Sequence, residues 1–83
     1  MIDITFSDFC IKVAREFSQF GHESQRYGQW FYNDLSLVNP ALAEHIRGSK
    51  YDPFYKERIS EETMQYLALM WGTEPKEPLY TFI

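Results

Sequence analysis

Cysteine is almost absent from this chain of 83 residues, which contains only Cys10. A single thiol cannot form an internal disulfide, and no cluster of cysteine and histidine with the spacing of a zinc site accompanies it. A chain without disulfides folds most simply in a reducing compartment. The sequence therefore predicts a cytoplasmic protein that needs no metal and no other cofactor.

Long apolar runs are also lacking. No stretch approaches the ~18 residues that a membrane-spanning helix requires. The N-terminal residues Met1–Ile4 show no basic region followed by an apolar one, which a signal peptide would have. We therefore expect neither a membrane span nor a signal peptide.

Positive charge is in short supply. Eight Lys and Arg stand against twelve Asp and Glu, which gives a formal net charge of −4. Proteins that bind duplex DNA draw most of their affinity from a basic face that neutralises phosphates, so this class is disfavoured. The acidic residues form no run along the chain, which also disfavours an acidic mimic of DNA.

Aromatic residues, in contrast, make up 18% of the chain. A domain of this size buries only about 60–65% of its unfolded surface, so large rings contribute heavily to its core. Apolar residues recur at three- and four-residue spacing in four segments, which predicts an all-α fold of four helices with a short third helix. We expect residues 1–72 to form one helical domain and residues 73–83 to form an extended C-terminal arm.

Local signals mark where these helices begin and end. Residues that cap helix N-termini precede each apolar segment: they are Thr5, Ser24, Asn39 (followed by Pro40 at the first helical position) and Ser60. Glycines that end helices follow three of the segments: they are Gly21, Gly48 and Gly72. Asp52-Pro53 predicts one further turn. The predicted core consists of Phe6, Phe9, Val13, Phe17, Phe31, Leu35, Leu42, Ile46, Phe54, Met64, Leu67 and Trp71.

The C-terminal arm ends in a strongly apolar segment that contains Leu79, Tyr80, Phe82 and Ile83. Such a segment is an aggregation hazard in water, so we expect it to be covered. It can pack on its own helices, including Met1–Ile4, it can join a second copy of the chain in a homodimer, or it can pair with the sheet edge of another protein. The residues alone leave these alternatives open.

Two short strings are distinctive. Arg26-Tyr27-Gly28-Gln29 is followed by Asn33 and Leu35, and Asp52-Pro53-Phe54-Tyr55 comes later in the chain. With Pro40 and Leu42 between them, these strings resemble a set of short, mostly uncharacterised bacterial and bacteriophage proteins over the segment from Phe9 to Trp71. The resemblance implies a bacterial cell and a phage or prophage accessory gene. It implies no activity and assigns no functional residues.

The sequence offers no catalytic constellation. His22-Glu23 begins like a helical zinc-protease motif, but Arg26 occupies the position of the second histidine. We interpret His22 and His45 as surface residues and Cys10 as a small hydrophobe on the apolar face of the first helix. We therefore expect no enzyme, no catalytic residue and no metal ligand.

Gly28 stands in the middle of the predicted second helix, where glycine costs ~1 kcal/mol relative to alanine. This cost indicates that another backbone approaches closely, with Ala14, Ala43 and Ala68 as the expected neighbours. Access of a ligand is the alternative.

Polar side chains on the second helix form a stripe beside the apolar one. Arg26, Gln29 and Asn33 share this stripe, and we expect Arg26 and Asn33 to bind loop carbonyls or to cap another helix, such as the turn at Asp52. The alternative is that the stripe recognises a partner.

The window from His45 to Arg58 is locally basic and rich in aromatic rings. Its basic residues are Arg47, Lys50, Lys56 and Arg58, and its rings are Tyr51, Phe54 and Tyr55. Basic groups interleaved with rings can bind single-stranded nucleic acid, although a charged loop between helices is the more common meaning of such a window.

Two functional hypotheses follow. The first is a protein-interaction module without enzymatic activity, a phage or prophage accessory that inhibits or retargets a bacterial host protein such as a defence factor. Tyrosine is a favoured anchor of interfaces, and we expect Tyr32, Tyr51, Tyr55 and Tyr80 to be exposed. The alternative is a nucleic-acid-binding domain that uses residues 45–58.

Overall fold

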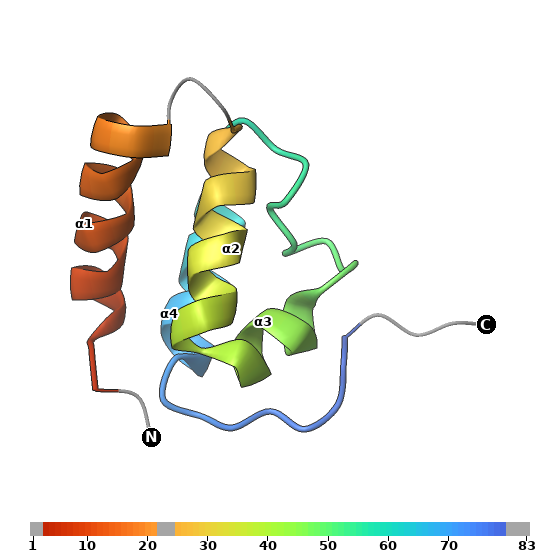
Figure 1. Ribbon diagram of the computed structural model, residues 1–83. Coiled ribbons are helices and arrows are strands. Elements are labelled where there is room, and N and C mark those ends of the chain that lie inside the picture. The colour runs from red at the N-terminus through yellow and green to blue at the C-terminus, as the bar shows by residue number, and fades with distance from the viewer. Residues whose placement is uncertain (1–2, 22–24, 80–83) are drawn as a thin grey trace.

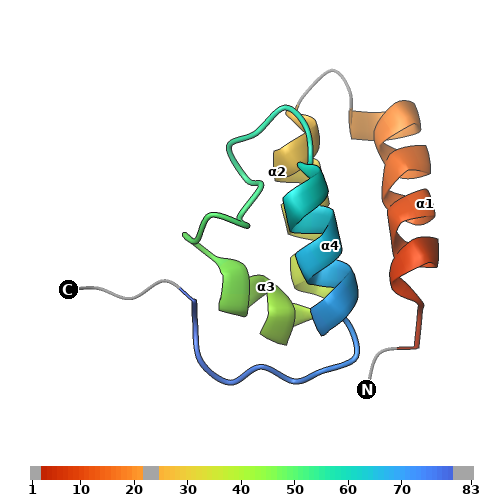
Figure 2. The same cartoon turned by 180° about the vertical axis from the view of Figure 1, so that it is seen from behind.

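The protein is an all-α domain, as the apolar spacing predicted. A computed structural model describes residues 3–21 and 25–79. It contains α1 (Phe6–Glu16), a π-helical turn η1 (Phe17–Gly21), α2 (Tyr27–Val38), α3 (Pro40–Ile46) and α4 (Glu61–Met70), and no strand occurs among the described residues (Figure 1). Short α3 crosses the end of the longer helices, and α1 stands at one side of the others in both views (Figures 1 and 2).

Three of the predicted N-caps are confirmed. The Thr5 hydroxyl accepts a hydrogen bond from the Asp8 N–H at 3.0 Å, and the Ser60 hydroxyl accepts one from the Thr63 N–H at 3.1 Å. The Asn39 side chain caps α3, and Pro40 occupies the first helical turn. Such side-chain bonds satisfy amides that the first turn leaves without an intrahelical partner. The fourth predicted cap, Ser24, lies outside the described residues, and α2 begins at Tyr27.

The three glycines predicted to end helices differ in conformation and surroundings. Gly48 has a φ of 74°, which is the left-handed conformation expected after α3. Gly21 does not adopt this conformation, so its predicted role is wrong: it is buried within η1, and a Cβ there would lie 2.7 Å from Cε3 of Trp30. Glycine at this position is required by the packing of the Trp30 ring rather than by backbone torsion. At Gly72 a Cβ would meet nothing within 4 Å.

The core confirms most of the predicted residues. The buried apolar side chains are Phe9, Val13, Phe31, Leu35, Leu42, Ala43, Ile46, Leu67 and Trp71. The remaining predicted core residues, Phe6, Phe17, Phe54 and Met64, are only half-buried. They lie at the margins of the packed helices, where one side of each ring or chain stays in contact with water.

Helix α1 is attached to the other helices chiefly by aromatic contacts around Trp71. The Trp71 ring lies 5.2 Å from the Phe6 ring and 5.1 Å from the Phe9 ring, centre to centre, and its Nε1 donates to the Ile4 carbonyl at 2.8 Å. Phe9 in turn meets Phe31 of α2 edge to face at 5.3 Å. Ring pairs of this geometry add stability beyond their buried area.

A buried polar side chain connects the α2–α3 junction to the end of α4. Asn39 is 2% exposed; its Oδ1 accepts from the Leu42 N–H at 3.4 Å and its Nδ2 donates to the Trp71 carbonyl at 3.2 Å. One side chain thus caps α3 and binds a carbonyl at the C-terminal end of α4.

The described part of the arm, residues 73–79, has no helix or strand and runs past α4 and α3 to the side away from α1 (Figures 1 and 2). The Leu79 N–H donates to the His45 carbonyl at 2.8 Å, and Nδ1 of His45 donates to the Glu77 carbonyl at 2.6 Å. This part of the arm therefore packs on its own α3. Tyr80, Phe82, Ile83 and the first two residues lie outside the described residues.

Candidate functional site

The segment between α3 and α4 contains no helix, but its turn is fixed by a carboxylate. Asp52 accepts hydrogen bonds from the Gly48 N–H at 2.8 Å and the Phe54 N–H at 2.9 Å. The Lys56 N–H then donates to the Pro53 carbonyl at 2.8 Å. These bonds form the turn that Asp52-Pro53 predicted, and the side chain of Asp52 replaces the pairing that a helix would supply.

Gly28 on α2 holds residues 51–60 against the helices, and we call these residues the anchored segment. Its N–H donates to the Lys56 carbonyl at 3.0 Å, and a Cβ at this position would overlap the carbonyl oxygens of Pro53 and Lys56. The predicted close approach of another backbone is confirmed, but its expected neighbours Ala14, Ala43 and Ala68 were wrong. The sequence could not identify the neighbour, because the two segments are far apart along the chain.

One side of the anchored segment borders an open hollow of about 420 Å³, which we call the Tyr55 hollow. Helices α2 and α3 and the segment itself all contribute to it. Its lining residues are Tyr32, Ser36, Glu44, Arg47, Gly48, Asp52, Phe54 and Tyr55. The side chain of Tyr55 is 80% exposed, so a ring on a fixed turn faces solvent at the edge of the hollow.

The charged groups of the Tyr55 hollow are of both signs. Arg47 lies 3.8 Å from the Glu44 carboxylate, and both side chains are exposed. Burial, followed by the negative charges of Asp52 and Glu44, raises the pKa of the Tyr32 phenol, so this hydroxyl stays protonated at neutral pH. It donates to the Ala43 carbonyl at 2.9 Å. Tyr32 is half-buried, so the prediction that it is exposed was wrong.

Arg26 reaches the same turn from the start of α2. Its guanidinium carbon lies 5.8 Å from the centre of the Tyr55 ring, which is a cation–π distance. Its Nε is buried and has no hydrogen-bond partner in the described part of the chain. The prediction that Arg26 and Asn33 bind loop carbonyls was wrong: the Gly28 N–H does so, and Asn33 contacts the Gln25 side chain at 3.5 Å.

Tyr51 does not line the Tyr55 hollow; it packs face to face on Tyr66 of α4, with the ring centres 4.1 Å apart. Its predicted exposure was also wrong, since it is half-buried. The Tyr66 hydroxyl in turn lies 2.7 Å from Nε2 of His45. His45 is thus half-buried with both ring nitrogens bonded, which corrects its interpretation as a surface histidine.

The other predicted interaction residues are dispersed. Lys50 pairs with Glu62 at 3.3 Å, Gln29 is half-buried on α2, and Lys56 is exposed. Tyr80 lies outside the described residues. The structure therefore brings Arg26, Tyr32, Arg47 and Tyr55 to one face and leaves Gln29, Asn33, Lys50 and Tyr51 apart from it.

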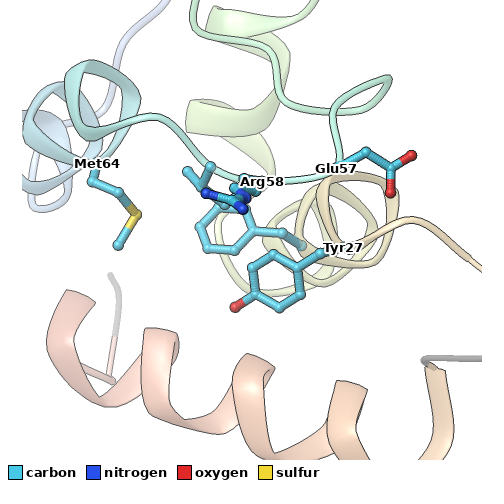
Figure 3. Close-up of a pocket in the computed structure, with 6 residues that line it drawn as sticks. Tyr27, Glu57, Arg58 and Met64 are labelled. Carbon is cyan, nitrogen blue, oxygen red and sulfur yellow. The ribbon is translucent and has the colours of Figure 1, made fainter.

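A second hollow, of about 410 Å³, is lined in part by the C-terminal residues of the anchored segment, and we call it the Arg58 hollow. Its lining residues are Tyr27, Phe31, Glu57, Arg58, Ile59 and Met64. Figure 3 shows the Arg58 guanidinium over the middle of the hollow, Met64 and Tyr27 at its edges, and α1 running past it.

The lining of the Arg58 hollow includes one acidic residue, Glu57, beside the neutral phenol of Tyr27. Burial raises the pKa of the Tyr27 phenol, and the nearby Cys10 thiol raises it further. Burial also raises the pKa of Cys10. Both groups are therefore neutral at neutral pH. Sequence reasoning selected Arg58 but not Phe31, Ile59 or Met64 as its neighbours, because three separate elements supply them.

No group of three or more His, Cys, Asp or Glu side chains placed to hold a metal occurs in residues 3–21 and 25–79. None of the helices in this part of the chain is long and apolar enough to cross a membrane. No family model, curated protein or solved structure matches the chain.

Proposed function

We propose that this protein is a binding module without enzymatic activity that acts on another protein through the Tyr55 hollow. The observation that carries the proposal is the exposed Tyr55 ring on a turn held by Asp52 and Gly28. Ordering a side chain on binding costs free energy, and an anchor on a fixed backbone reduces that cost. Tyrosine and arginine, which lie together here as Tyr55, Arg26 and Arg47, are the residue types most enriched at the energetic centres of interfaces.

The resemblance of Arg26–Leu35 and Asp52–Tyr55 to short bacterial and bacteriophage proteins supplies the context of the proposal. The partner is a protein of the bacterial host, such as a defence factor, which this chain inhibits or retargets in the cytoplasm. Small accessory proteins of phages commonly act by binding and blocking a host protein. The choice of a host protein as partner rests on analogy with that class of proteins.

The nucleic-acid alternative draws less support from the same segment. Arg47 and Lys50 already lie beside Glu44 and Glu62, and Tyr51 is packed on Tyr66. The number of unpaired cations and free rings that nucleic acid could use is correspondingly smaller. An electrophoretic shift assay at low salt with single- and double-stranded probes tests this alternative directly.

The proposal is tested by affinity capture from bacterial lysate with the full chain and two variants. Tyr55→Ala removes the exposed ring and is expected to reduce recovery of a specific partner by tenfold or more, since a central anchor contributes about 2 kcal/mol or more to binding. Ile11→Ala removes another exposed apolar side chain, on the outer side of α1, and should leave recovery unchanged. Failure to recover any specific partner, or equal recovery with all three proteins, contradicts the proposal.

A further inference from the structure

The Arg58 hollow combines an apolar floor with a cation at its opening. Phe31 at the base is 1% exposed and is held by edge contact with Phe9, while Ile59 and Met64 are half-buried at the sides. The floor is therefore formed before any partner arrives. Its volume of about 410 Å³ lies near the lower end of the range for ligand pockets, which suits one large side chain better than a cofactor.

The cation at the opening has no counter-charge in the described part of the chain. No carboxylate lies within 4.0 Å of the Arg58 guanidinium among residues 3–21 and 25–79. Its neighbour Glu57 turns its carboxylate away from it in Figure 3. Among the other basic residues, Lys12, Arg47 and Lys50 each lie beside an acidic side chain.

This arrangement is complementary to one kind of ligand. An apolar side chain would cover Phe31, Ile59 and Met64, and an adjacent carboxylate would meet the guanidinium. Arginine binds carboxylates through two parallel N–H bonds when the geometry allows, which lysine cannot do. The neutral phenol of Tyr27 adds no repulsion against such a carboxylate.

We propose that the Arg58 hollow binds a partner-protein segment in which a large apolar residue is followed by an acidic one. This inference rests on the proposed function, because it describes how the same partner would be recognised. Both the Tyr55 hollow and the Arg58 hollow are lined in part by residues of the anchored segment.

The test uses the full chain, labelled with ¹⁵N, and two blocked dipeptides. The acidic probe is acetyl-phenylalanyl-glutamate amide, and its uncharged match is acetyl-phenylalanyl-glutamine amide. The acidic probe is expected to shift the amide signals of Tyr27, Arg58 and Ile59 in a saturable way. It should bind about fivefold more tightly than the uncharged probe, the preference that one exposed ion pair supplies.

Two variants assign the effect to the hollow. Arg58→Gln removes the cation from an exposed side chain and should abolish the preference for the acidic probe. Arg15→Gln removes an exposed cation from α1 and should leave the preference unchanged. Thermal unfolding of both variants confirms that each remains folded.

Three results overturn the inference. They are the absence of saturable shifts at the hollow, equal binding of the two dipeptides, and tighter binding of 4-phenylbutyrate than of the acidic dipeptide, which would indicate a site for a free carboxylic acid. Because capture by the Tyr55 hollow is measured separately with Tyr55→Ala, the proposed function can stand when this inference fails.

Discussion

The two non-helical stretches on either side of α4 are held in different ways. Residues 51–60 are fixed mainly by bonds that involve backbone atoms: the Gly28 N–H binds the Lys56 carbonyl, and the Asp52 carboxylate binds two backbone N–H groups. The arm, residues 73–79, is fixed at its far end by one residue, His45, whose ring and carbonyl bind Glu77 and Leu79.

The difference indicates which stretch can present a stable surface. The anchor at Gly28 lies in the interior, where two carbonyl oxygens occupy the space of a missing side chain. The contact at His45 lies near the surface, where water competes for the same hydrogen bonds. We therefore expect residues 51–60 to hold both hollows open, and the arm to be released at a lower cost in free energy.

The largest effect is expected from Gly28→Ala. The added methyl group overlaps the carbonyls of Pro53 and Lys56. These are backbone atoms, so moving them aside costs more free energy than moving the end of a flexible side chain. Although alanine is the better helix former by ~1 kcal/mol, we expect a net loss of about 3 kcal/mol in the free energy of unfolding, measured by urea denaturation.

Gly72→Ala is the matched control for Gly28→Ala. A Cβ at position 72 meets nothing within 4 Å, so the change in stability should stay within about 0.5 kcal/mol. Equal stability of the Gly28→Ala and Gly72→Ala variants would show that the anchor of residues 51–60 is not at Gly28.

Asn39→Ala tests the base of the arm. The variant loses the cap of α3 and leaves the Trp71 carbonyl without its side-chain partner in a buried place. We expect a loss of about 2 kcal/mol, from the missing cap and the unsatisfied carbonyl together. The measurement is the midpoint of urea unfolding, and Ser60→Ala, which removes an exposed cap, should cost less.

Asp52→Ala tests the second anchor of residues 51–60. Removal of the carboxylate frees the amides of Gly48 and Phe54, which then bind water because the turn is near the surface. We expect a loss of about 1 kcal/mol. Hydrogen exchange at Phe54 should accelerate, whereas Asp3→Ala, at an exposed position before α1, should change neither quantity.

His45→Phe should give the smallest change in stability and a clear local one. The variant keeps a ring beside Tyr66 but loses the bonds of both ring nitrogens, to the Glu77 carbonyl and to the Tyr66 hydroxyl. We expect a loss of about 0.5 kcal/mol or less in global stability and faster hydrogen exchange at the Leu79 amide. Tyr66→Phe removes only the hydroxyl that meets Nε2, so the Leu79 amide should keep its protection in that variant.

Local sequence patterns, formed by residues close together in the chain, predicted much of this fold. Thr5, Asn39 and Ser60 cap helices because the amides that they bind lie three positions further along the chain. The apolar spacing of Phe9, Val13, Phe31 and Leu35 identified buried faces because a helix repeats every 3.6 residues. These rules need no knowledge of how the helices pack.

Only the tertiary structure decided what those faces meet. The partner of Gly28 is a carbonyl 28 positions later, Tyr32 is half-buried because its hydroxyl meets Ala43, and Arg58 lies over rings from α2. The amino-acid sequence marked Gly28 as costly and Arg58 as basic, but it could not say which atoms would surround them. The physical reason is that local propensities act over one helical turn, whereas a hollow takes its shape from the packing of segments that are distant in the chain.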